Sequence, residues 1–146
     1  MGYALAEAFA SRGAEVVLVS GPVSQRVRSP GITVVQVTSA EQMFQACREA
    51  IGKVDVAVFN AAVSDYTPAE RSSGKVKRGA DQWALQLKPT RDIAATLGKD
   101  KQDGQFFVGF ALETENEMKH AREKLEWKNL DLIVLNSLRQ EGAGFG

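Results

Sequence analysis

Short apolar runs alternate along this chain with longer stretches whose apolar residues recur at helical spacing. The run Glu15–Ser20 is almost continuously apolar, which is typical of a strand buried on both faces of a sheet. Similar runs follow, and the stretch Trp83–Leu87 alternates like a strand on the rim. The predicted strands are Glu15–Ser20, Ile32–Val37, Asp55–Asn60, Trp83–Leu87, Phe106–Phe110 and Leu130–Leu135.

The stretches between these runs indicate helices. In the first of them Leu5, Ala8 and Phe9 lie on one side, and Gly13 can end the helix. Ser39 can cap a later one. The predicted helices are Gly2–Arg12, Ala40–Ile51, a helix from Thr90 or Asp92 to Leu97, and Asn116–Trp127.

Alternating strands and helices predict an α/β fold with a doubly wound, mostly parallel sheet and helices on both faces, which is Rossmann-like. The length of 146 residues fits a single domain spanning residues 1–146. Such domains normally begin with a strand and a glycine-rich turn, whereas the first element here is a helix. We therefore expect that an opening strand is missing and that the domain is incomplete at its N-terminus.

The composition disfavours several classes of partner and site. Eighteen basic residues balance eighteen acidic ones, so no nucleic acid or anionic membrane is expected as a partner. No apolar run approaches the ~20 residues of a membrane span, and we expect a cytoplasmic protein. Cys47 and His120 are the only residues of their types, which disfavours a serine–histidine triad, a disulfide or a cysteine-rich metal site.

Candidate chemistry gathers in the loop that follows Asp55–Asn60. In α/β sheets, ligands bind at the carboxyl ends of the strands. The small residues Ala61 and Ala62 would let a ligand approach the backbone there. Asp65 can accept hydrogen bonds from hydroxyl groups or help to hold Mg²⁺, but it can equally cap a turn.

Two lysine pairs could neutralise a triphosphate. Lys75 and Lys77 face the same way if their segment is extended, and Lys124 and Lys128 lie one turn apart on a helix. For each pair the alternative is a solvated surface. We expect Lys101 to be exposed and without a role. No histidine base accompanies the lysines, which suits a reaction that depends on positioning and charge neutralisation.

Several motifs together resemble a known family. In chain order they are NAAVSDY (Asn60–Tyr66), KVKR (Lys75–Arg78), LKPTRDIA (Leu87–Ala94), VGFALET (Val108–Thr114), AREKLEWKNLDLIVLN (Ala121–Asn136) and GFG (Gly144–Gly146). Their order and spacing closely resemble phosphopantothenoylcysteine synthetase. In bacteria this enzyme is usually the carboxyl-terminal half of the bifunctional flavoprotein of coenzyme A biosynthesis.

The resemblance implies an amide-forming ligase that joins 4′-phosphopantothenate to cysteine, with CTP rather than ATP as co-substrate and Mg²⁺ as cofactor. It also implies a homodimer and a fused or associated flavin-dependent decarboxylase. Lys75 would be catalytic, on a flexible flap, and Ala62 would lie near phosphopantothenate. The nucleotide would contact Phe59, Asn60, Ala61, Asp65, Lys75, Lys88, Pro89, Thr90, Arg91, Phe107, Lys124 and Lys128.

The chain departs from the family pattern in two places. The asparagine loop that handles the acyl nucleotide precedes a Met-Gly pair in the family, and that pair is Met1-Gly2 here, so we expect the chain as given to bind nucleotide weakly and not to complete the ligation. Arg91 stands where many members have proline.

Two alternatives remain open. A short-chain dehydrogenase would share the Asn60-Ala61-Ala62 motif, but it needs a Tyr-x-x-x-Lys pair, and Tyr66 is followed at that spacing by Glu70. A non-catalytic nucleotide-binding module is the other.

Overall fold

The computed structural model describes residues 1–70, 72, 74–75, 77–79, 83–113 and 116–137. The GFG motif and part of the predicted flap lie outside the described residues. The helices are α1 (Gly2–Ala10), α2 (Ala40–Ile51), α3 (Ile93–Gly98) and α4 (Glu117–Trp127). The strands are β1 (Val16–Ser20), β2 (Ile32–Gln36), β3 (Val56–Phe59), β4 (Tyr66–Pro68), β5 (Leu87–Pro89), β6 (Phe106–Glu113) and β7 (Leu132–Ser137).

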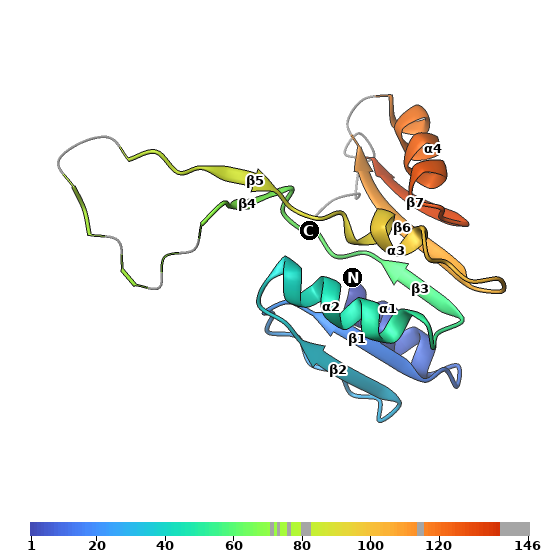
Figure 1. Ribbon diagram of the computed structural model, residues 1–146. Helices are drawn as coiled ribbons and strands as arrows, with labels where there is room; N and C mark the ends of the chain where they lie inside the picture. Colours follow the sequence, from blue (N-terminus) through green and yellow to red (C-terminus); the bar gives the residue numbers. More distant parts are fainter. Residues whose placement is uncertain (71, 73, 76, 80–82, 114–115, 138–146) are drawn as a thin grey trace.

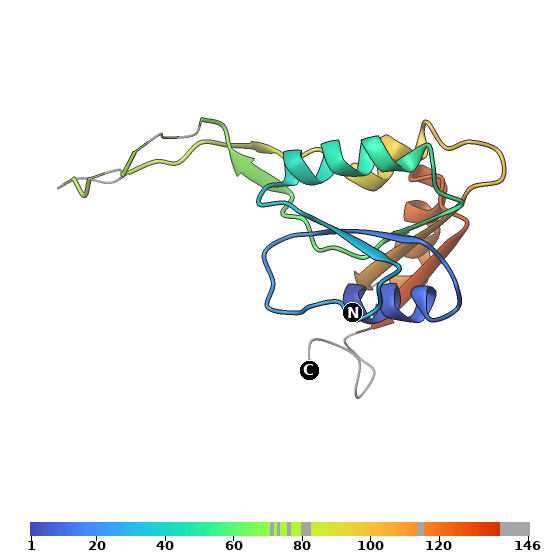
Figure 2. The same ribbon diagram turned by 90° about the horizontal axis from the view of Figure 1, so that it is seen from below.

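The body of the molecule contains two parallel sheets (Figure 1). β1 pairs with β2, and β6 lies between β3 and β7. Helices lie on both faces, with α2 and α3 on one side and α1 on the other (Figure 2). The predicted α/β class with a parallel sheet is confirmed.

Local signals explain why the helices begin where they do. The Ser39 side chain accepts a hydrogen bond from the backbone N–H of Gln42, which caps α2, and Asp92 does the same for Ala95 at the start of α3. Between these helices Phe44, Ile93 and Leu97 form a buried core cluster. This cluster fixes α3 against α2, beside the end of β3.

A gap separates the two parallel sheets. In the part of the chain that the structure describes, no strand lies between β1 and β3. Val17, Leu18, Val56 and Val58 line the space between them from both sides. The exposed fractions of Val17 and Val56 are 47% and 42%. The prediction that these strands are buried on both faces is therefore wrong for this chain, because each has an open edge.

A hairpin arm projects from the body between β3 and α3 (Figures 1 and 2). Its base is the antiparallel pair β4–β5, in which Thr67 opposes Lys88. The sequence predicts a loop at Tyr66–Pro68 and a strand at Trp83–Leu87, and both predictions are wrong. The strand begins only at Leu87, because pairing with β4 defines it, and that pairing joins segments far apart in the sequence.

Candidate functional site

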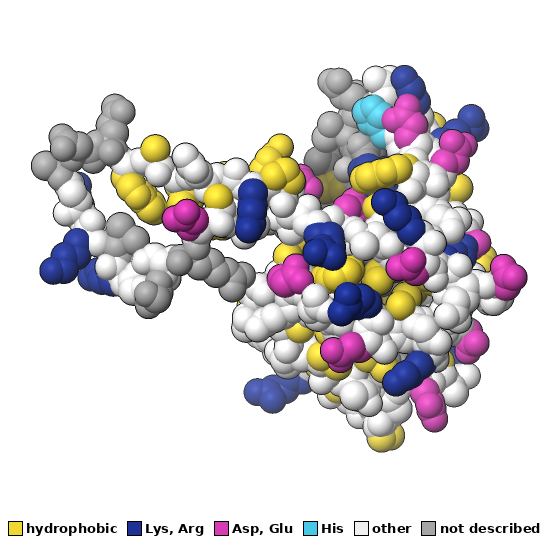
Figure 3. Space-filling view, viewed as in Figure 1, with side chains coloured by type: hydrophobic (Ala, Val, Ile, Leu, Met, Phe, Trp, Pro, Cys, Tyr) yellow, Lys and Arg dark blue, Asp and Glu magenta, His cyan; other side chains and the backbone are white. Residues whose placement is uncertain are grey.

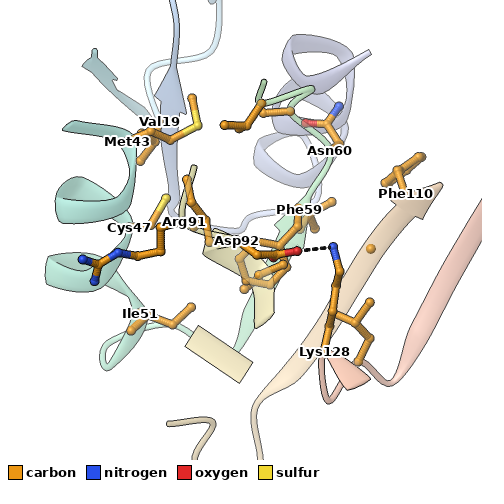
Figure 4. Close-up of a pocket in the computed structure, with 18 of the residues that line it drawn as sticks. Val19, Met43, Cys47, Ile51, Phe59, Asn60, Arg91, Asp92, Phe110 and Lys128 are labelled. Atoms are coloured by element: carbon orange, nitrogen blue, oxygen red, sulfur yellow. Dashed lines mark ion pairs between the residues drawn. The ribbon is translucent and has the colours of Figure 1, made fainter. Parts of the chain in front are cut away.

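A cavity of about 340 Å³ extends from the gap between β1 and β3 to the carboxyl end of β3 and the middle of β6 (Figure 4). The chain leaves β3 at Phe59 and passes along the cavity wall through Asn60 and Ala61 to Asp65. The segment that starts α3 forms a second wall, and α4 contributes a third. One end of the cavity therefore lies at the carboxyl end of β3, at the edge of the sheet where α/β proteins bind their ligands.

Two ammonium groups come to this cavity from α4. Lys124 and Lys128 are one helical turn apart and both line it. The Nζ of Lys128 lies 2.9 Å from Oδ2 of Asp92, and only 21% of the Lys128 side chain is exposed. An anionic ligand in the cavity would meet these charges at a partly desolvated position, where electrostatic attraction is stronger than in water.

The cavity walls also contain uncharged polar groups. Oγ1 of Thr90 is buried and has no hydrogen-bond partner among the described residues. The backbone N–H of Thr90 donates to the carbonyl of Asp65 at 2.8 Å, which joins the two walls of the cavity. An unsatisfied buried hydroxyl costs free energy, and because this oxygen has almost no accessible surface, the side chain would have to turn before a ligand in the cavity could bind it.

Aromatic rings pack beside the cavity. The rings of Phe59 and Phe107 pack edge to face, 5.5 Å apart. The guanidinium of Arg91 lies 4.2 Å from the centre of the Phe44 ring, a cation–π contact that ties the start of α3 to α2. Arg91, in place of the proline common in the resembling family, thus has a packing role in this chain.

Not every predicted site residue reaches the cavity. Of the described residues predicted to bind nucleotide, those that line it are Phe59, Asn60, Ala61, Asp65, Thr90, Arg91, Lys124 and Lys128. Lys88 and Pro89 are exposed in β5, and Lys75 is exposed on the arm that projects from the body. The Phe107 ring is fully buried. Ala62, predicted to contact the substrate, does not line the cavity.

The sequence analysis missed other lining residues. Phe110 lines the cavity nearer the carboxyl end of β6 than Phe107 does, and Asp92, Ile93 and Ala94 form the wall at the start of α3. A usable signal was present, because the N-terminus of a predicted helix that follows a strand commonly faces a ligand site. The sequence indicates Asp92 only as a possible start of this helix.

The pKa values of Cys47 and Asp131 are shifted in the folded protein. Burial raises the pKa of the Cys47 thiol, which keeps it protonated and agrees with a packing role. A hydrogen bond from Lys101 and another from the backbone N–H of Phe107 lower the pKa of Asp131. Both donors reach Oδ2 of Asp131 at 2.6 Å. Only 12% of the Lys101 side chain is exposed, so the prediction that it is an exposed lysine without a role is wrong.

The described residues contain neither a membrane-spanning helix nor a metal-binding cluster. No helix among the described residues is long and apolar enough to cross a membrane. The same residues contain no cluster of three or more histidine, cysteine, aspartate or glutamate side chains that could hold a metal ion.

Comparison with known proteins gives the family. The family model described as "DNA/pantothenate metabolism flavoprotein C-terminal domain" matches residues 1–146. The chain belongs to this family. It is 44% identical over 146 residues to the coenzyme A biosynthesis bifunctional protein CoaBC of Bacillus subtilis, of which it covers 36%. It is 53% identical to a cysteine/cysteine sulfinic acid decarboxylase from an unknown prokaryotic organism and covers 41% of that protein.

A solved structure agrees with this assignment. The crystal structure of the C-terminal domain of coenzyme A biosynthesis bifunctional protein CoaBC superimposes with a TM-score of 0.78 at 40% identity, covering 92% of this chain and 62% of that domain. The Rossmann-like α/β fold is thereby confirmed. The family membership also decides against the short-chain dehydrogenase. The chain spans well under half the length of the curated relatives named above.

Proposed function

We propose that this domain provides the nucleotide site of a phosphopantothenate–cysteine ligase that uses CTP. The observation that carries the proposal is the convergence of Lys124 and Lys128 with Phe59–Ala61 on one cavity at the carboxyl end of β3. Cationic side chains and backbone groups at such an edge can bind the phosphates of a nucleoside triphosphate.

The proposed reaction has two steps. In the first, the carboxylate of 4′-phosphopantothenate attacks the α-phosphorus of CTP, and the bond to the β-phosphoryl oxygen breaks to release pyrophosphate. In the second, the cysteine amine attacks the acyl carbon of the acyl-cytidylate, loses a proton and displaces CMP. Neither step needs a protein nucleophile, so the contribution of the domain would be positioning and charge stabilisation.

The cavity suggests a division of roles. Lys124 and Lys128 would neutralise phosphoryl oxygens, and Phe110 would offer an aromatic surface to the base. We assign this last role to Phe110 rather than to Phe107, because the Phe107 ring is fully buried. Similarly, Thr90 and the start of α3 replace Lys88 and Pro89 in the proposed nucleotide contacts.

Lys75 remains the proposed catalytic lysine, although the structure does not place it in the cavity. It lies on the hairpin arm, which extends from the two strands β4 and β5 (Figure 1). Asp65, which lines the cavity, immediately precedes β4. The base of the arm is therefore joined to the cavity wall, and a change of angle at this base would change the position of Lys75 relative to the nucleotide.

Magnesium is proposed to arrive with the nucleotide. The described residues contain no metal-binding cluster, so they do not fit a resident metal ion. Mg²⁺ is commonly held by substrate phosphates with one or two carboxylates. Asp65 is the lining carboxylate proposed for this purpose, because both oxygens of Asp92, the other lining carboxylate, already have partners.

A homodimer is also proposed. The arm and its base expose Tyr66, Trp83, Leu85 and Leu87, each at least half exposed. In the space-filling view, hydrophobic side chains gather along this arm (Figure 3). Large exposed apolar side chains on a projecting element are typical of a protein–protein contact. Light scattering after gel filtration would show a dimer, and Trp83→Ser should shift it toward the monomer.

The decisive experiment is a reaction assay with 4′-phosphopantothenate, cysteine, CTP and Mg²⁺. In a protein that carries the asparagine loop ahead of Met1, we expect pyrophosphate release that depends on CTP, followed by formation of the cysteine amide. Because a relative is named a cysteine/cysteine sulfinic acid decarboxylase, carbon dioxide release from cysteine should be measured in parallel. Nucleotide-independent release of carbon dioxide without any pyrophosphate would overturn the proposal in favour of decarboxylation.

A further inference from the structure

Asp92 connects two features of the cavity through one carboxylate. Its Oδ1 accepts a hydrogen bond from the backbone N–H of Ala95 at 2.9 Å and so caps α3. Its Oδ2 lies 2.9 Å from Nζ of Lys128 (Figure 4). The two oxygens therefore have separate partners, one in its own helix and one at the end of α4.

The other end of α3 is attached to the same segment. The Asn129 side chain donates a hydrogen bond to the carbonyl of Gly98 at 2.9 Å. A Cβ atom on Gly98 would lie only 2.1 Å from the carbonyl oxygen of Lys128. Both ends of this short helix thus contact the segment Lys128–Asn129, which fixes the distance between the Asp92 carboxylate and the backbone of Lys128.

The Lys128 side chain would be mobile without such a contact. A lysine has four rotatable bonds, and ordering them costs conformational entropy. Its ammonium also lies 5.6 Å from the Trp127 ring, but Trp127 is itself 64% exposed. Asp92, which lies in the cavity wall, holds the ammonium at that wall.

We infer that Asp92 is a positioning residue that holds the Lys128 ammonium in place for an anionic ligand. This inference rests on the proposed nucleotide site and adds to it a group that the sequence indicated only as a helix cap. Since Asp92 has two functions, a substitution can separate them. Asparagine is as good a helix cap as aspartate, but its amide carries no charge to hold a lysine.

The experiment measures the affinity for CTP with Mg²⁺ by calorimetry in four proteins: the unsubstituted protein, Asp92→Asn, Lys128→Ala and the double variant. We expect Asp92→Asn to weaken binding about tenfold, and to change it by less than about twofold when Lys128 is already alanine. The melting temperature should stay unchanged because the cap is kept. Asp100→Asn, which removes an exposed carboxylate just beyond α3, is the matched charge control and should leave affinity unchanged.

A second readout does not depend on a ligand. Acylation of lysines, followed by mass spectrometry, should label Lys128 several-fold faster in Asp92→Asn, with labelling of Lys119 unaltered. Tighter CTP binding by Asp92→Asn, an equal loss in both backgrounds, or unchanged labelling of Lys128 would each overturn the inference. If the unsubstituted protein binds no CTP, the proposed function fails, and the labelling alone then decides whether Asp92 holds Lys128.

Discussion

Lys75, the proposed catalytic lysine, is the first residue to test. In a protein that carries the asparagine loop ahead of Met1, we expect Lys75→Ala to lower kcat/KM for the ligation strongly, because losing a charge contact to the transition state in a closed site costs on the order of 2–4 kcal/mol. The measurement is steady-state pyrophosphate release at varied CTP.

The control for Lys75 must be a lysine at the surface of the body. Lys101 is unsuitable, because it is largely buried against Asp131. Lys119 is 75% exposed and lies 3.9 Å from Glu123, a distance at which an exposed ion pair contributes little. Lys119→Ala should keep full activity. Equal activity in both variants would assign Lys75 to the solvated surface.

Asp131 makes the stability of the domain depend on pH. Its pKa is lowered in the folded protein by Lys101 and by the backbone N–H of Phe107, so the ionised form stabilises the fold. That stabilisation is present above the pKa of the unfolded state and is lost as pH falls through the lower pKa of the folded state. Asp131→Asn should therefore lower the melting temperature at pH 7 more than at pH 3. An equal decrease at both pH values would contradict this role.

At the scale of elements, the gap between β1 and β3 predicts where a further strand would fit. A Cβ atom on Gly2 would lie 2.9 Å from Oδ1 of Asn60, so α1 begins beside the carboxyl end of β3. A strand inserted parallel to β1 and β3 would end at that position and could lead directly into α1. The apolar lining from Val17, Leu18, Val56 and Val58 suits an apolar strand.

We therefore expect that a five-residue apolar strand and a glycine-rich turn, joined ahead of Met1, raise the melting temperature by several degrees. The strand would pair two open edges and bury side chains on both faces. A matched extension with alternate residues changed to lysine is the control. If both extensions have the same melting temperature, the gap is not a strand site.

The elements also show what the sequence could predict. The bounds of α2 were predicted correctly because its signals are local, namely the Ser39 cap and the spacing of Phe44, Cys47 and Ile51. The short pair β4–β5 was missed because each strand has only three residues and their pairing is non-local. The cavity loop after β3 was predicted for a topological reason, since parallel strands bring their carboxyl ends to one edge.

The position of α3 relative to α4 could not be predicted in this way. It depends on the close approach of Gly98 to Lys128, which is a property of packing and not of any local pattern. For the same reason the sequence did not show that Asp92 and Lys128 meet. Phe107 and Phe110 carry the same side chain, and only the structure shows which of them lies against solvent-accessible space.

For the whole molecule, the gap between the two parallel sheets has a consequence for how the fold opens. Backbone hydrogen bonds do not cross it among the described strands, so β1 and β2 connect to the other sheet mainly through helix packing, with α2 contacting both β1 and α3. Two such halves need not unfold together. Amide hydrogen exchange should therefore be faster throughout β1 and β2 than in β6, which is paired on both sides. Identical protection of all three strands would instead mean that helix packing alone makes the domain a single cooperative unit.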